Sequence, residues 1–141
     1  MESKEFEKLV EKGYEQLPQW VRKKIKNVAV LVEDEPSQDD REAEGLGDDE
    51  TLLGLYKGIP LSARGEGYGV GMTLPDIITL YQIPIEDEAK EELENMDTPC
   101  PYFEAVKKVV AETIWHEFAH HFGMDEHEVR KREQRRDGDV V

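Results

Sequence analysis

Five consecutive residues, His116-Glu117-Phe118-Ala119-His120, have the types and spacing of a hydrolytic metal site. Side chains four apart on a helix lie one turn above each other, so His116 and His120 can direct both imidazoles at one metal ion. Glu117 lies about 100° around the helix from His116, where it can act as a general base on a water molecule at the metal. Two ligands, a base and an activated water are the components of a zinc hydrolase.

The residues before this motif have helical periodicity. Apolar side chains recur at spacings of three and four: Phe103, Val106, Val110, Ile114 and Phe118. They predict one helix face that packs on a core, with His116 and His120 on a neighbouring stripe. Gly123, three residues after His120, predicts the end of the helix and a turn that lets the next residues fold back toward the metal. The alternative interpretation is a hydrogen-bonded helical histidine pair without a metal.

Residues His116 to Glu126 resemble the extended zincin signature H-E-x-x-H-x-x-G-x-x-H/D, and HEFAHHFG followed by acidic residues resembles the small bacterial minimal-zincin metallopeptidase-like family. LLGLYKGIPLSARG (52–65) and LPDIITLYQIPIE (74–86) also resemble middle segments of that family, so the resemblance covers residues 5–130. The family usually has Asp as its third zinc ligand. The matching residue here is Glu126, whose extra methylene changes the reach of the carboxylate. Asp125 and His127 flank it and stay open as alternatives.

The resemblance implies a zinc-dependent metallopeptidase that hydrolyses peptide bonds, with Zn²⁺ held by His116, His120 and Glu126. Glu117 would take a proton from the attacking water and pass it to the leaving amine. Because no Tyr or His follows His127, an oxyanion donor would have to be Tyr56, Tyr68 or Tyr81. His121 is predicted to lie on the core side of the helix, as a packed or hydrogen-bonded residue.

A second hypothesis is a non-catalytic metal-binding or protein-interaction module on a zincin scaffold. Glu117 favours the enzyme, because a structural zinc site takes four protein ligands and needs no base. The absence of further catalytic residues after the motif favours the module.

Composition limits the function classes. The chain has 141 residues, predicted to form a single domain over 1–141, and a formal net charge of −15. This charge argues against nucleic-acid binding and against docking on an anionic membrane, and it predicts that strongly acidic substrates are repelled. No apolar run is long enough to span a membrane, and MESKEFEK lacks a signal-peptide core. With Cys100 as its single cysteine, the protein is expected to be soluble and cytoplasmic, acting on a peptide or protein substrate.

The rest of the chain predicts mixed α and β structure. Helices are expected over 3–17, with Ser3 as N-cap, over 86–96 and, with a basic cluster, over 128–136. Strands are expected over 28–32, which should be buried, over 52–56, and over 77–83, which Pro84 should end. Ten of the eighteen residues of 33–50 are acidic, which predicts a solvated loop. The glycines of 65–71 predict a hairpin tip, because no Lys-Ser/Thr follows for a phosphate loop.

These elements predict an α+β architecture, a small twisted mixed sheet with the H-E-x-x-H helix packed along one face. It agrees with the zincin-like fold that the resemblance implies, in which an edge strand runs above the metal. The strand over 77–83 is the candidate for that edge, where a peptide substrate could bind by adding a strand.

Overall fold

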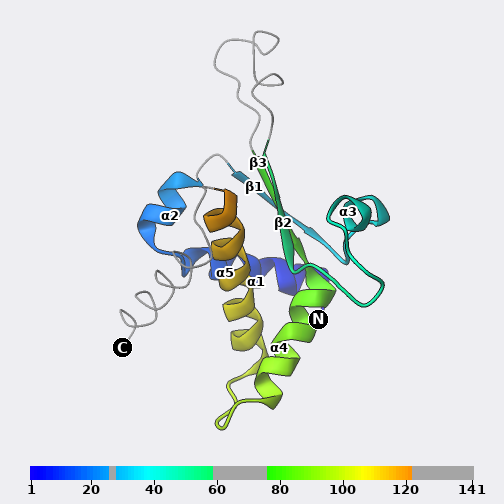
Figure 1. The fold of residues 1–141 in the computed structure, drawn as a ribbon. Helices are drawn as coiled ribbons and strands as arrows, with labels where there is room; N and C mark the ends of the chain where they lie inside the picture. The colour runs from blue at the N-terminus through cyan, green and yellow to red at the C-terminus, as the bar shows by residue number, and fades with distance from the viewer. Residues whose placement is uncertain (26–27, 59–75, 122–141) are drawn as a thin grey trace.

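The computed structural model describes residues 1–25, 28–58 and 76–121 of the chain. Helices and strands alternate irregularly along these residues (Figure 1). In chain order the elements are α1 (Ser3–Glu15), α2 (Gln19–Lys24), β1 (Val28–Glu33), α3 (Gln38–Ala43), β2 (Gly54–Lys57), β3 (Asp76–Tyr81), α4 (Gln82–Glu94) and α5 (Tyr102–His121). The predicted α+β class is confirmed.

The three described strands form one mixed sheet in the order β1-β3-β2. β1 runs parallel to β3, with Val30 opposite Ile78, and β2 runs antiparallel to β3, with Tyr56 opposite Ile78. The prediction that the strand near 77–83 is the edge was therefore wrong, because β3 is paired on both sides. Its residues Ile78 to Tyr81 are all buried, as expected of a central strand. Of the described strands, β2 and β1 form the two edges.

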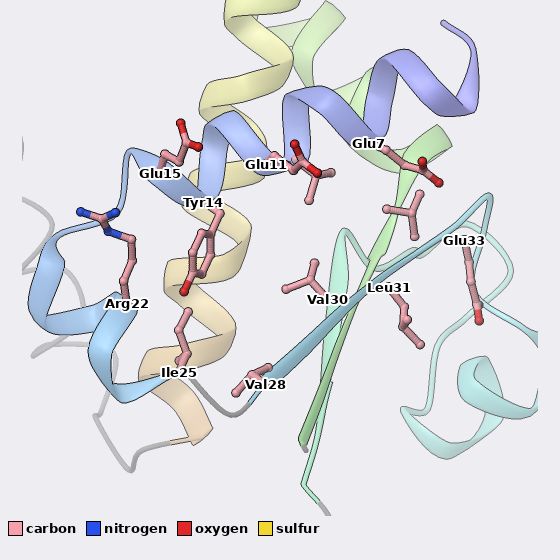
Figure 2. Close-up of a pocket in the computed structure, with 12 residues that line it drawn as sticks. Glu7, Glu11, Tyr14, Glu15, Arg22, Ile25, Val28, Val30, Leu31 and Glu33 are labelled. Carbon is pink, nitrogen blue, oxygen red and sulfur yellow. The ribbon is translucent and has the colours of Figure 1, made fainter. Parts of the chain in front are cut away.

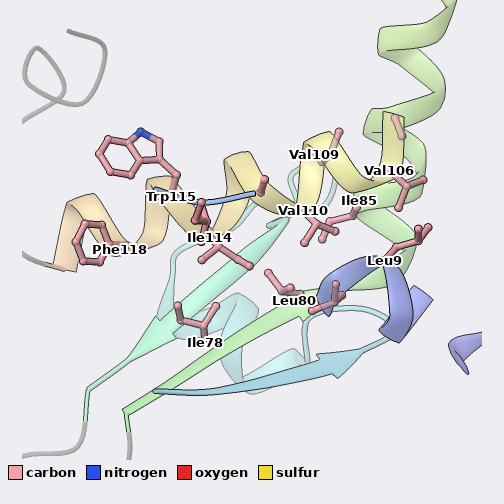
Figure 3. Packing of buried hydrophobic residues seen from close by; sticks show 14 of the residues in the cluster. Leu9, Ile78, Leu80, Ile85, Val106, Val109, Val110, Ile114, Trp115 and Phe118 are labelled. Carbon is pink, nitrogen blue, oxygen red and sulfur yellow. The ribbon is translucent and has the colours of Figure 1, made fainter. Parts of the chain in front are cut away.

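Helix α5 lies along one face of the sheet and supplies nearly half of the core (Figure 3). Ile78 and Leu80 of β3 face Val110 and Ile114 of α5, and all four side chains are fully buried. α1 and α4 pack against α5. The predicted apolar stripe of α5 is thus confirmed except at its first member: Phe103, in the first turn of the helix, is 51% exposed.

The junction between β3 and α4 lies earlier in the chain than the sequence predicted. The strand ends at Tyr81 and the helix begins at Gln82, so Pro84 lies in the first helical turn and does not end a strand. A proline is tolerated there because the first-turn N–H groups have no partner within the helix. The predicted helix over 86–96 is therefore α4 with an earlier start.

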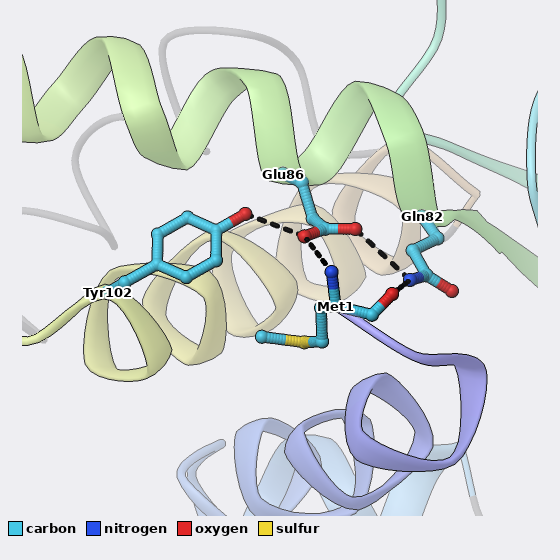
Figure 4. A network of polar contacts seen from close by, with 4 residues as sticks. All are labelled: Met1, Gln82, Glu86 and Tyr102. Carbon is cyan, nitrogen blue, oxygen red and sulfur yellow. Dashed lines mark hydrogen bonds and ion pairs between the residues drawn. The ribbon is translucent and has the colours of Figure 1, made fainter.

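The start of α1 is fixed by tertiary contacts and not by a side-chain cap. Ser3 was predicted to be the N-cap, but the N-cap position is Glu2 and its side chain accepts no cap hydrogen bond. Instead the Met1 ammonium lies 3.4 Å from Glu86 Oε1, and Gln82 Nε2 donates to the Met1 carbonyl oxygen (Figure 4). The Tyr102 hydroxyl also donates to Glu86, over 2.7 Å. This network joins the starts of α1, α4 and α5.

Burial alone would raise the pKa of Glu86. The hydrogen bonds from Tyr102 and Gln82 and the charge of the Met1 ammonium outweigh burial, so the pKa of Glu86 is lowered overall.

Two short helices were not predicted. α2 lies just before β1, and α3 interrupts the acidic run that was expected to be a loop. Ser37 caps α3 by accepting a hydrogen bond from the Asp40 N–H, and Arg41 donates to the carbonyl oxygens of Gly47 and Glu50. The expected strand over 28–32 is present as β1, but it is only half-buried. Cys100 is also half-buried, against the core.

Candidate metal centre

The three motif residues stand on the last turns of α5, at one wall of a cleft. His116 and Glu117 are half-buried and His120 is exposed. The ring centroids of His116 and His120 are 6.3 Å apart, with the planes nearly perpendicular. This arrangement follows from the i, i+4 spacing, as the sequence predicted.

The histidine pair fits a shared zinc ion. Two imidazoles bound to one tetrahedral zinc, at about 2.0 Å per nitrogen, have ring centroids about 5 Å apart. The observed separation is roughly 1 Å longer than this, a difference that rotation about the side-chain torsions can supply. Within the residues that the structure describes, no third His, Cys, Asp or Glu joins them to make a group of three. The predicted third ligand, Glu126, and its alternatives Asp125 and His127 lie outside those residues.

Glu117 is fixed by a contact between its carboxylate and β2. Its carboxylate accepts a hydrogen bond from the backbone N–H of Tyr56 on β2, over 3.2 Å. Burial raises the pKa of Glu117 above its ordinary value, and the negative charge of Glu44 adds to this rise. The Tyr56 N–H and the charge of His120 act in the opposite direction without cancelling it. A carboxylate with a raised pKa is a stronger base than an ordinary glutamate.

Strand β2 packs alongside α5 with a matching spacing of residues, and this contact positions Glu117. Gly54 lies against Thr113: a Cβ added to Gly54 would be 2.7 Å from Thr113 Cγ2. Two residues later Tyr56 reaches Glu117, four residues after Thr113. A step of two residues along a strand and four along a helix both cover about 6 to 7 Å. The absence of a side chain at Gly54 therefore allows strand and helix to stay close over the whole site.

Beyond Glu117, a polar cluster ties the end of α5 to the sheet. The ring of His121 stacks on Tyr56 with centroids 3.8 Å apart, and His121 Nε2 lies 3.6 Å from Asp76 Oδ2. The Tyr56 hydroxyl donates to the same carboxylate over 2.8 Å. His121 was predicted to lie on the core side. Its side chain is instead 36% exposed and packs on the ring of Tyr56. Sequence reasoning missed Asp76, because nothing in the motif points to a residue forty positions earlier.

The candidate oxyanion donors differ in their surroundings. The Tyr56 hydroxyl is engaged with Asp76. Tyr81 is fully buried and lies 3.4 Å from Asp40, and burial together with Asp40 and Glu33 raises the pKa of Tyr81 to about 12. Tyr81 does not line the cleft and is unsuited to the role. Tyr68 lies outside the described residues, as does the glycine-rich segment 65–71.

The cleft itself has a volume of about 440 Å³ and lies between α5, α4 and the start of β2. His116, Glu117 and His120 line it together with Thr113. The opposite wall carries Glu88 and Glu92 of α4. Burial raises the pKa of Glu88, and the neighbouring charges of Glu92 and Glu91 raise it further. The cleft is therefore an acidic environment around the histidine pair.

A helix with this histidine pair beside a half-buried glutamate, packed on a small mixed sheet, is the arrangement expected of a metallohydrolase-like class of protein. Comparison with family models agrees: the model of the zincin-like metallopeptidase family matches residues 25–136. The chain belongs to the zincin-like metallopeptidase family. A search of curated proteins gave no match. Among the described residues, no helix is both long and apolar enough to cross a membrane.

Proposed function

We propose that this chain is a zinc-dependent peptidase in which His116 and His120 bind the metal and Glu117 is the general base. The observation that carries the proposal is the placement of Glu117. Its carboxylate lies in the same cleft as both histidines and is oriented by the backbone of β2. A zinc site with a purely structural role would take four protein ligands and would not need this carboxylate.

Glu126 completes the proposed ligand set, with Asp125 and His127 as the alternatives to be tested. When bound, zinc supplies Lewis acidity, polarising a carbonyl and making a nearby water more acidic. The donor set of two imidazoles and a carboxylate is one that catalytic zinc sites use.

The remaining chemistry belongs to Glu117. Its carboxylate accepts a proton from the water that adds to the carbonyl carbon of the scissile peptide bond. The same carboxyl then gives this proton to the amide nitrogen as the C–N bond breaks, so that an acid and an amine leave the site. The hydrogen bond from the Tyr56 N–H engages one carboxylate oxygen, Oε2, and the other oxygen would accept the proton of the reacting water.

A peptide substrate would lie along the outer side of β2. Among the described strands, β2 pairs only with β3, and the Tyr56 N–H points away from β3 because it donates to Glu117. Backbone groups on such an edge can pair with an extended peptide. The glutamates on the α4 wall disfavour acidic peptides, in keeping with the net charge of −15.

The test is metal content by mass spectrometry, followed by cleavage of a peptide library. Wild type should hold about one zinc per chain, and His120→Ala should lose it. Glu117→Gln should keep the metal and lose activity by about 10²- to 10⁴-fold. Activity that survives Glu117→Gln would refute the mechanism. A protein that takes up no zinc when the metal is supplied would be the protein-interaction module.

A further inference from the structure

A second groove, of about 950 Å³, lies between α1 and β1 (Figure 2). None of the residues that line it also lines the cleft of the histidine pair. α1 forms one wall and the floor is apolar, with Val10 and Tyr14 from α1, Ile25 after α2, and Val28, Val30 and Val32 from β1.

The groove exists because the helices cover β3 but do not cover β1. Val30 pairs with Ile78 and Val32 with Leu80, so these valines lie on the same face of the sheet as their partners. Ile78 and Leu80 are 0% exposed, whereas both valines are only half-buried. α1 packs mainly on α5, and a groove remains between α1 and β1. Apolar, β-branched side chains are thus left partly exposed along a whole strand.

The groove also includes the free edge of β1. Consecutive residues of a strand point to opposite faces, yet Val30, Leu31, Val32 and Glu33 all line the groove. The groove must therefore wrap around the edge of the strand. Leu31 is 47% exposed there, and no other described strand pairs with this side of β1. Such an edge can accept a further strand.

The rim of the groove is acidic. Glu7, Glu11 and Glu15 follow one another at intervals of four on the wall formed by α1, and Glu33 closes the far end (Figure 2). Arg22 is the cationic residue among those that line the groove. Its Nε is buried and has no hydrogen-bond partner within the described part of the chain. The wall formed by α1 therefore presents a row of carboxylates to anything bound in the groove.

We propose that this groove binds an extended segment of a partner polypeptide that alternates basic and apolar residues and adds to the edge of β1. In a strand added to this edge, the lysine or arginine side chains lie on the helix face of the sheet and meet the glutamates of α1, and the apolar side chains point to the opposite face, where Leu31 is exposed. A second copy of this chain is a poorer occupant. It would bring another net charge of −15 to the same glutamates.

The experiment uses the full chain and a fluorescent peptide of alternating lysine and valine, about as long as β1. Binding is followed by fluorescence anisotropy. The variant Glu7→Gln/Glu11→Gln/Glu15→Gln should weaken binding about tenfold or more, because each exposed ion pair contributes a factor of about two to five. The matched control Glu2→Gln/Glu5→Gln/Glu94→Gln removes the same charge outside the groove and should bind like wild type. A peptide of alternating glutamate and valine should not bind.

Amide hydrogen exchange locates the peptide independently of any variant. Bound peptide should slow the exchange of residues 28–33 and leave the β2 edge unchanged. Equal weakening by the two triple variants would overturn the proposal, because binding would then be unspecific charge attraction. Protection at β2 in place of β1 would also overturn it.

Two other occupants would also overturn the proposal. If replacing Arg135 and Arg136 by Glu tightens peptide binding severalfold, a basic segment of this chain already fills the groove. If wild type is a dimer that the groove variant alters and no peptide binds, the occupant is a second copy.

Discussion

Gly54→Ala tests how closely β2 must approach the site helix. Among the described residues Gly45 is the glycine with a positive φ, so alanine fits the backbone conformation of Gly54. Any loss of stability in Gly54→Ala must therefore come from packing. The new Cβ would lie 2.7 Å from Thr113 Cγ2 and 3.1 Å from the Thr79 carbonyl oxygen. Ordinary carbon contacts are about 3.5 to 4.0 Å, so the strand or the helix must move by about 1 Å.

We expect Gly54→Ala to lower the free energy of unfolding by about 2 kcal/mol, within the usual range for overpacking a core. Thr113→Ser removes the buried methyl that causes the clash, but keeps the hydroxyl that donates to the Val109 carbonyl oxygen. That single change should cost about 1 kcal/mol. In the double variant the new Cβ occupies the vacated space. Its total cost should then be about 1 kcal/mol, well below the sum of about 3 kcal/mol.

The assay is urea unfolding followed by circular dichroism, for the two single variants and the double variant. Gly13→Ala is the matched control, because a Cβ there meets Val110 Cγ1 at 2.8 Å and not Thr113. Its cost should add to that of Thr113→Ser without coupling. Additive costs for Gly54→Ala and Thr113→Ser would refute the close packing of β2 on α5, and with it the account of how Glu117 is positioned.

Three further predictions follow from the same structure. In metal-free protein, a ¹³C NMR titration should give the carboxyl of Glu117 a pKa above that of an ordinary glutamate. Zinc should lower that pKa by adding positive charge. An ordinary pKa in the metal-free protein would show that this carboxyl is not buried. Glu86→Gln should cost about 1 to 2 kcal/mol of stability at neutral pH. The pKa of Glu86 is lowered in the folded state, so the stability difference between wild type and variant should be largest above the ordinary glutamate pKa. It should fade as the pH falls through the lowered pKa. A stability difference that does not depend on pH would contradict this. Ile114→Ala should cost about 2 to 5 kcal/mol in thermal unfolding, whereas Phe103→Ala should change little, and equal costs would contradict the assigned faces of α5.

Several features of the site could be predicted from the sequence because they are local. The i, i+4 spacing of His116 and His120 places both rings on one side of any helix, whatever surrounds it. The same periodicity identified Val110 and Ile114 as core residues. The α+β class followed from the order of apolar runs along the chain.

The contacts between distant segments were decided only by the tertiary structure. The sequence made the strand near 77–83 an edge, but pairing on both sides places β3 at the centre and gives β2 the position beside Glu117. Strand order depends on which partners compete for each edge, and apolar runs of similar length do not encode it. The role of Gly54 likewise becomes visible only once Thr113 lies against it. The motif thus determined which residues could do the chemistry, and long-range packing decided which backbone group holds the base.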